Sequence, residues 1–272
     1  MIRRAGALGV LVLLASRAAV AAPLPESGYG MPREVSRDGH LIDELIHYTM
    51  AAAVLVFVVV LGFMLWSFVR HGRRHLPRFT HGSPRSVTLM MGSIALIALA
   101  VDGHLFITTL RDMNDVFWNF SGVEKDPRTV RLEVNAHQWA WVARYAGPDG
   151  LFNTPDDVVT LDDVRVPVGT PVLIQLASTD VIHSFYLPNL RVKRDAVPGM
   201  VNEVTFEARE SGEFEIACAQ HCGPNHYKMR GVLTVMPPAE FDAWLARASA
   251  DARRAYDEDD HEAHWGWAWR SL

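Results

Sequence analysis

Residues 218–229 read CAQHCGPNHYKM and hold the only two cysteines of this 272-residue chain. The stretch lies between two short runs, 213–218 and 230–236, which have the alternating apolar pattern of half-buried β-strands. A histidine and a methionine follow the second cysteine at short intervals. A loop of this composition between two strands is a disulfide, a redox thiol pair, a haem attachment site or a metal site.

Two of these readings fit the spacing poorly. Haem attachment requires two residues between the cysteines and a histidine directly after them, whereas three residues separate Cys218 from Cys222 and Gly223 follows. A disulfide across so short a loop stabilises little, because the gain from loop closure shrinks with loop length. It also gives no role to His226 or Met229. A purely structural disulfide therefore stays open only as the less favoured alternative.

A metal site uses all four side chains, because thiolate, imidazole and thioether form a soft ligand set that favours copper. A blue-copper site on a β-sandwich needs one cysteine, two histidines and a weak methionine ligand. His183, which lies between two strand-like runs and 35 residues before Cys218, is the best candidate for the distant histidine. The surplus cysteine is what two coppers need if both sulfurs bridge both metals.

We therefore predict a binuclear copper site. Each copper keeps one terminal histidine, either His183 or His226. Met229 completes the coordination of one copper, and a backbone carbonyl of the loop completes that of the other. No coordination position is left open for a substrate, so the predicted site suits electron transfer.

The loop belongs to a longer region with the pattern of a β-protein. Further short runs rich in valine, isoleucine, threonine and aromatic residues cover residues 129–135, 138–145, 171–178 and 201–208. Runs of this length and spacing predict an all-β sandwich or barrel. Helical periodicity returns only at 238–256, before an acidic, tryptophan-rich tail.

The first 110 residues have a different character. Residues 1–22 have the layout of a secretory signal peptide, with two arginines, an apolar run and small residues at the end. Two segments, 48–69 and 87–110, are long and apolar enough to cross a bilayer as helices. The loop between them carries five arginines and no acidic residue. By the positive-inside rule this loop is cytoplasmic, and both ends of the mature chain face the other side of the membrane.

These patterns divide the chain into four parts. We expect a signal peptide at 1–22, an N-terminal segment with the transmembrane hairpin at 23–110, an exported β-domain at 111–238, and a helix with its tail at 239–272. Between residues 112 and 240 there are 18 acidic and 11 basic residues. This acidic excess argues against a nucleic-acid partner and is compatible with a basic protein partner.

Three motifs carry a resemblance to a known family: HQWAWVARY at 137–145, STDVIHSFYLPNLRVKRDAVPG at 178–199, and the cysteine loop. Up to about residue 250 the chain resembles subunit II of the haem–copper cytochrome c oxidases. The resemblance implies a membrane-anchored all-β protein, in which a two-helix transmembrane hairpin precedes a cupredoxin-like Greek-key β-sandwich. It also implies a binuclear copper centre, CuA, that takes electrons from cytochrome c and passes them to haem in subunit I. There O2 is reduced to water, coupled to proton translocation.

The resemblance assigns roles to individual residues. The implied copper ligands are His183, Cys218, the backbone carbonyl of Gln220, Cys222, His226 and Met229. Trp139 matches the tryptophan that first receives electrons in this family. Asp180 matches an acid of the family's docking surface for cytochrome c. Further candidates for that surface are Asp156, Asp157, Asp162 and Asp163.

The chain departs from the family pattern at two places. The residue between the cysteines is commonly a glutamate that also binds magnesium or manganese at the interface with subunit I. Here it is Gln220, which has no carboxylate, so we do not predict that second metal. The stretch 147–157, GPDGLFNTPDD, looks like an insertion. Its oxygen-bearing side chains are of the kind that bind calcium, but the spacing is not that of an EF-hand and favours a plain acidic turn.

The leading hypothesis is the electron-input subunit of a terminal oxidase in a bacterial inner membrane, with its copper domain in the periplasm. Its expected partners are subunit I and the other oxidase subunits, cytochrome c and the lipid bilayer. One alternative is the same copper domain in another respiratory enzyme, such as a nitric oxide reductase. The other alternative is a copper-delivery chaperone, which has a thioredoxin-like fold and does not need His226 and Met229.

Overall fold

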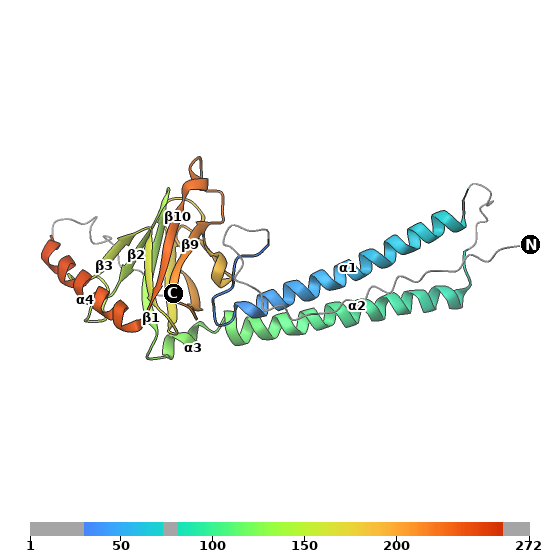
Figure 1. Ribbon diagram of the computed structural model, residues 1–272, viewed down its shortest axis with the longest axis horizontal. Coiled ribbons are helices and arrows are strands. Elements are labelled where there is room, and N and C mark those ends of the chain that lie inside the picture. The colour runs from blue at the N-terminus through green and yellow to red at the C-terminus, as the bar shows by residue number, and fades with distance from the viewer. Residues whose placement is uncertain (1–29, 73–80, 258–272) are drawn as a thin grey trace, which may run out of the picture. The chain divides into compact units, whose positions relative to one another are not determined.

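The computed structural model of the protein describes residues 30–72 and 81–257 (Figure 1). The predicted signal peptide at 1–22 and the tryptophan-rich tail from residue 258 lie outside the described residues, as does most of the arginine-rich loop. The chain divides into two compact units, 1–33 and 34–272. All described helices and strands belong to the second unit.

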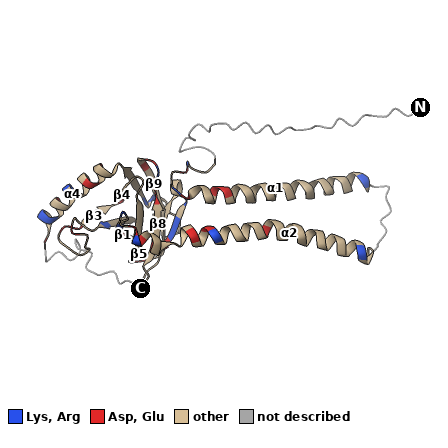
Figure 2. Ribbon diagram, turned by 90° about the horizontal axis from the view of Figure 1, so that it is seen from below, with Lys and Arg blue, Asp and Glu red and all other residues tan. Residues whose placement is uncertain are grey.

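Two long helices, α1 (Gly39–Arg70) and α2 (Pro84–Asp112), contain the spans predicted at 48–69 and 87–110. Both are long and apolar enough to cross a membrane. Pro84 begins α2 after Ser83, whose side chain accepts a hydrogen bond from a backbone N–H of the first turn. Figure 2 shows basic residues at the ends of α1 and α2 that lead into the loop between them, the charge pattern from which the sequence predicts a cytoplasmic loop.

Short helical segments and strands follow α2. A π-helical turn (Met113–Phe117) and α3 (Phe120–Lys125) lead into two five-stranded sheets. The first sheet has the order β3 (Val158–Leu161), β2 (Ala140–Tyr145), β1 (Val130–His137), β5 (Pro171–Ser178), β8 (Asn202–Glu207). The second has the order β4 (Asp163–Pro167), β10 (Arg230–Met236), β9 (Gly212–Cys218), β6 (His183–Leu187), β7 (Val192–Ala196).

These sheets form the β-sandwich that the strand-like runs predicted. Neighbouring strands are antiparallel, except that β1 pairs with β5 and β4 with β10 in parallel. Alternate side chains of the strands are buried in one apolar core, including Val134 of β1, Phe185 of β6 and Leu233 of β10, each with no exposed surface. Burying a side chain of this size contributes roughly 1.5–3 kcal/mol.

The C-terminal helix α4 (Pro238–Ala255) closes one side of the sandwich. Its apolar face packs on the core, and the rings of Trp244 and Tyr145 meet edge to face at 5.2 Å. The helix also holds the 147–157 insertion, because Ser249 Oγ donates to the carbonyl oxygen of Asp156 at 2.8 Å. The Arg253 guanidinium pairs with the Asp156 carboxylate at 3.0 Å. The insertion is thus a turn whose carboxylate binds an arginine.

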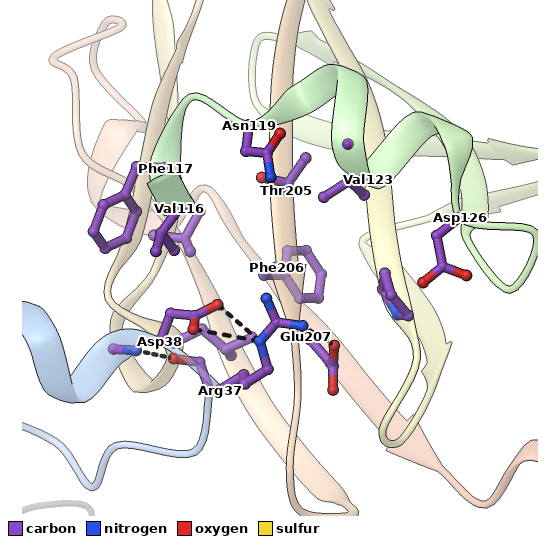
Figure 3. Close-up of a pocket in the computed structure, with 16 residues that line it drawn as sticks. Arg37, Asp38, Val116, Phe117, Asn119, Val123, Asp126, Thr205, Phe206 and Glu207 are labelled. Atoms are coloured by element: carbon purple, nitrogen blue, oxygen red, sulfur yellow. Dashed lines mark hydrogen bonds and ion pairs between the residues drawn. The ribbon is translucent and has the colours of Figure 1, made fainter. Parts of the chain in front are cut away.

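A cavity of about 220 Å³ lies between the segment before α1, the turn after α2 and strand β8 (Figure 3). Arg37 projects into it and pairs with Asp38 at 3.1 Å and with Glu207 at 2.8 Å. Its lining holds none of the predicted site residues, which gather elsewhere in the sandwich.

Candidate metal centre

The strand pairing brings the predicted ligands to one end of the sandwich. Strand β6 runs antiparallel to β9, and Phe185 pairs with Cys218. His183, two residues earlier on β6, therefore lies beside the loop that follows Cys218. The backbone closes the base of that loop, since Cys218 N–H donates to the Met229 carbonyl at 3.2 Å and Ala219 N–H to the Ser184 carbonyl at 3.0 Å.

The loop places its donor atoms around a common centre. Cys222 Sγ lies 3.7 Å from Cys218 Sγ, 3.6 Å from His226 Nδ1 and 3.8 Å from Met229 Sδ. Cys218 Sγ also lies 3.2 Å from the Gln220 carbonyl oxygen. All the loop groups that the family resemblance assigns as ligands are therefore brought together.

His183 reaches the same centre from the neighbouring strand. Its Nδ1 lies 3.1 Å from Met229 Sδ, and its ring is fully buried. One donor atom of His183 and the two sulfurs all lie within 4.8 Å of one another. Across residues 30–72 and 81–257, this is the one group of three or more histidine, cysteine or acidic side chains close enough to share a metal ion.

The two cysteines are free thiols, and their 3.7 Å separation is far longer than a disulfide bond of about 2 Å. Burial acts to raise the pKa of the Cys218 thiol, but hydrogen bonds from His183 and the Ser184 backbone outweigh it and hold that pKa below its usual value. Burial and the neighbouring Cys218 sulfur raise the pKa of Cys222. One thiol thus ionises readily, and the second would lose its proton on binding a metal.

The donor set fits copper. Two sulfurs lie close enough to bridge two metal ions, each histidine directs Nδ1 towards the sulfurs, and a thioether completes the set. Met229 and Cys222 are 1% and 3% exposed, so water is excluded from one side of the centre. The Gln220 side chain is exposed and brings an amide, not a carboxylate, to the surface of the loop.

Trp139 packs directly against this loop. Its indole N–H donates to the carbonyl oxygen of Cys222 at 3.2 Å, and the side-chain amide of Gln138 donates to the same oxygen at 2.8 Å. The close approach requires glycine at position 223, where φ is +117° and a Cβ atom would lie 3.0 Å from Gln138 Nε2. The predicted electron-receiving tryptophan therefore touches the backbone of a predicted ligand.

Sequence reasoning missed Gln138 and Trp141. The buried ring of Trp141 stands edge-on to His183, with centroids 6.1 Å apart, and edge-on to Phe185 at 5.2 Å. The HQWAW motif was the signal that could have identified them. It contains two tryptophans, one just before strand β2 begins and one within it. The family resemblance pointed to Trp139 alone, and no sequence rule indicated that Trp141 supports the histidine.

The five candidate docking acids do not form one surface, and two assignments need correction. Asp156 is 1% exposed and bound to Arg253, so its carboxylate is not available to a partner. The Asp157 side chain is 9% exposed and lies 3.8 Å from the Arg144 guanidinium. Both precede β3 at the end of the sandwich that carries the insertion, away from the copper loop, because β2 and β3 are antiparallel.

The other three acids lie at the end of the sandwich that carries the cysteine loop, which we call the copper end. Asp162 accepts a hydrogen bond from Trp141 N–H at 2.8 Å, and Asp163 pairs with Arg165 at 2.7 Å. Asp180 turns inward, with Oδ1 lying 2.8 Å from His183 Nε2 and Oδ2 lying 2.6 Å from Gln138 N. Its side chain is 29% exposed.

Comparison with known proteins fixes the family. The family model for the periplasmic domain of cytochrome c oxidase subunit II matches residues 154–236. The alternative cytochrome c oxidase subunit 2 of Bradyrhizobium diazoefficiens is 30% identical over 234 residues, covering 75% of this chain and 79% of that protein. The chain belongs to the cytochrome c oxidase subunit II family.

Two further proteins are similar to this chain. Cytochrome c oxidase subunit 2 of Alkalihalophilus pseudofirmus is 30% identical over 215 residues, which cover 76% of this chain and 58% of that longer relative. The crystal structure of the periplasmic domain of subunit II from Bradyrhizobium japonicum is 28% identical, with a TM-score of 0.40, and covers 45% of this chain and 94% of that one.

Family membership gives the parts of the structure their general roles. Subunit II proteins belong to terminal oxidases, which are oxidoreductases, and the family usually binds copper. The two long helices and the β-sandwich are the membrane anchor and the cupredoxin-like periplasmic domain of such a subunit.

Proposed function

We propose that this subunit II holds a binuclear CuA centre and is the electron-input subunit of a cytochrome c oxidase in a bacterial inner membrane. The observation that carries the proposal is the pair of free thiols 3.7 Å apart, flanked by His183 on one side and His226 on the other. Copper bound there would supply reversible one-electron transfer. No mononuclear site needs the second sulfur.

The distances suggest how the terminal ligands divide. His183 and Met229 lie 3.1 Å apart and would serve one copper. His226 would serve the other, together with the Gln220 carbonyl that faces Cys218 Sγ. Both thiolates would bridge. Because the strands and the closed loop base fix these groups, the residues would move little when an electron arrives.

The surface next to Trp139 is the proposed site for cytochrome c. The indole of Trp139 is partly exposed and donates to the Cys222 carbonyl, so it offers a short covalent and hydrogen-bonded route from the surface to a bridging cysteine. Haem in subunit I is the proposed acceptor, and O2 reduction with proton translocation takes place there. We propose copper alone for this chain, since Gln220 lacks the carboxylate for an interface magnesium or manganese.

The test uses the full chain in detergent, reconstituted with copper and measured by electron spin resonance. We expect one unpaired electron shared by two equivalent coppers. His226→Ala should abolish this signal, whereas His221→Ala should keep it. His221 is the matched control because it is an exposed histidine of the same loop whose ring lies 5.6 Å from that of His226. A mononuclear spectrum from the wild type, or no copper retained after dialysis, would contradict the proposal.

A second candidate function is the same role in a nitric oxide reductase. It would use the same copper loop, and the partner enzyme would distinguish it. Purification of the chain with its native partner, followed by assays with O2 and with nitric oxide, separates the two. The copper-delivery alternative receives no support from the β-sandwich, because such chaperones have a thioredoxin-like fold.

A further inference from the structure

We infer that Asp180 is a positioning residue that fixes both the His183 ring and the turn carrying Trp139, rather than a docking acid for cytochrome c. The inference rests on the proposed copper centre and concerns how one carboxylate ties a metal ligand to the residue that receives electrons. It departs from the role that the family resemblance gives to Asp180.

One carboxylate oxygen sets the orientation of His183. Asp180 Oδ1 lies 2.8 Å from His183 Nε2 and accepts the Val181 backbone N–H at 2.6 Å. An ionised carboxylate only accepts hydrogen bonds, so Nε2 carries the proton and Nδ1 faces the sulfur atoms. A carboxylate behind a ligating histidine fixes its tautomer and raises its basicity.

The other carboxylate oxygen sets the position of Trp139. Asp180 Oδ2 accepts the Gln138 backbone N–H at 2.6 Å. Gln138 and Trp139 in turn both donate from their side chains to the Cys222 carbonyl, at 2.8 and 3.2 Å. Asp180 therefore lies at the junction of two paths, one to a terminal ligand and one to a bridging ligand.

These contacts engage both carboxylate oxygens from within the chain. Both oxygens already accept strong hydrogen bonds from groups of the same chain, and the side chain is 29% exposed. A docking acid would instead present free oxygen atoms to a lysine or arginine of cytochrome c. The geometry thus predicts that loss of Asp180 changes the copper centre itself.

Two variants separate the two halves of this role. Asp180→Asn keeps one oxygen for His183 but turns an NH2 group towards Gln138 N–H, so it should break the link to Trp139 selectively. Asp180→Ala removes both links. Glu215→Gln is the matched charge control, because Glu215 is an exposed acid on β9, three residues before Cys218, and pairs with Arg230 at 3.2 Å.

The measurements are the midpoint potential of the copper, the histidine hyperfine splitting and the rate of electron uptake from reduced cytochrome c, all on the full chain. We expect Asp180→Ala to raise the potential and change the splitting, because the less basic imidazole stabilises oxidised copper less. Asp180→Asn should keep a near-native splitting, raise the potential less, and slow electron uptake. Glu215→Gln should leave the potential and splitting as in the wild type.

Unchanged potential and splitting in both Asp180 variants, with only a salt-dependent increase in KM for cytochrome c, would overturn the inference and restore a docking role. If Asp180→Ala does not fold, the nearly isosteric Asp180→Asn still decides, because a positioning role raises the copper potential and slows uptake even at saturating cytochrome c, whereas a docking role changes neither. Failure of the proposed function itself is distinguishable, because the wild type would then lack the binuclear signal before any variant is made.

Discussion

The two ends of the β-sandwich both bury polar groups, but they balance them differently. At the end with the insertion, the Arg144 guanidinium bonds the Glu133 carboxylate at 2.7 Å, and Arg253 bonds Asp156. At the copper end, the two cysteine sulfurs lie 3.7 Å apart and converge with one donor atom of His183 within 4.8 Å. Charged groups that pair with one another indicate a structural cluster, whereas converging sulfur and imidazole donors indicate a site completed by a ligand.

Cys222→Ser provides the sharpest test of the copper end. It removes one bridging sulfur, and we expect complete loss of the binuclear spectrum because a hydroxyl does not replace a thiolate for copper. The free energy of unfolding of the metal-free chain should change little. Electron spin resonance and urea unfolding of the same sample check both parts. A retained binuclear signal would contradict the assignment of Cys222 as a bridge.

Trp139→Ala tests the next largest effect, on function without loss of metal. We expect it to block electron uptake from reduced cytochrome c while the copper spectrum stays that of the wild type. Stopped-flow mixing with reduced cytochrome c measures this directly. Trp118→Ala is the control, because Trp118 is 55% exposed and lies outside the loop contacts. Uptake at the normal rate in Trp139→Ala would refute the electron-receiving role.

Arg144→Met should produce the opposite result at the other end. Burial raises the pKa of Glu133 while Arg144 opposes the shift, so removal of the guanidinium leaves a buried carboxylate without its partner. Such a loss costs about 3–5 kcal/mol of unfolding free energy. We expect this from urea unfolding, with an unchanged copper spectrum in the folded fraction. Arg254→Met, on the exposed face of α4, should change the unfolding free energy little.

Asp156 gives the same end of the sandwich a pH dependence. Burial acts to raise its pKa, but hydrogen bonds from Arg253 and Thr154 outweigh it and lower the pKa. Because the folded pKa is below the unfolded value of about 3.9, this contribution is present above that pH and is lost as the pH falls through the folded pKa. Asp156→Asn should therefore cost about 2 kcal/mol at neutral pH. The difference from the wild type should shrink below about pH 4, and a constant difference in urea midpoints from pH 6 to pH 3 would contradict the ionised contact.

The contrast between the two ends also separates what the sequence could and could not predict. The proposed copper ligands within the loop could be named from the sequence, because they lie within twelve consecutive residues and their chemistry is specific. The long apolar helices and the alternating strands were predictable from periodicity alone. His183 was predicted because a copper site has a fixed number of ligands and the loop was one histidine short.

Side-chain pairing across the fold was not predictable. Gln138 and Asp180 are 42 residues apart, and their contact depends on how two turns meet after the sheets assemble. The same applies to Asp156 and Arg253, 97 residues apart, which turned an expected surface acid into a buried one. Acidic residues near a predicted site look alike in sequence, although the structure places some of them inside ion pairs.

Asp162→Asn tests the smallest expected effect and bears on how cytochrome c is recognised. Asp162 is the remaining candidate acid at the copper end. Asp156 and Asp157 lie at the other end. Asp163 pairs with Arg165, and Asp180 bonds to His183 and Gln138. Ile182 and Tyr227, each beside a histidine proposed as a copper ligand, are 44% and 67% exposed, so this surface also presents large apolar and aromatic side chains. Since exposed charge pairs are screened over about 8 Å at physiological ionic strength, we expect only a weak decrease of turnover with added salt. Asp162→Asn should reduce that slope further, and steep salt dependence that persists in Asp162→Asn would show that acids elsewhere recognise the donor.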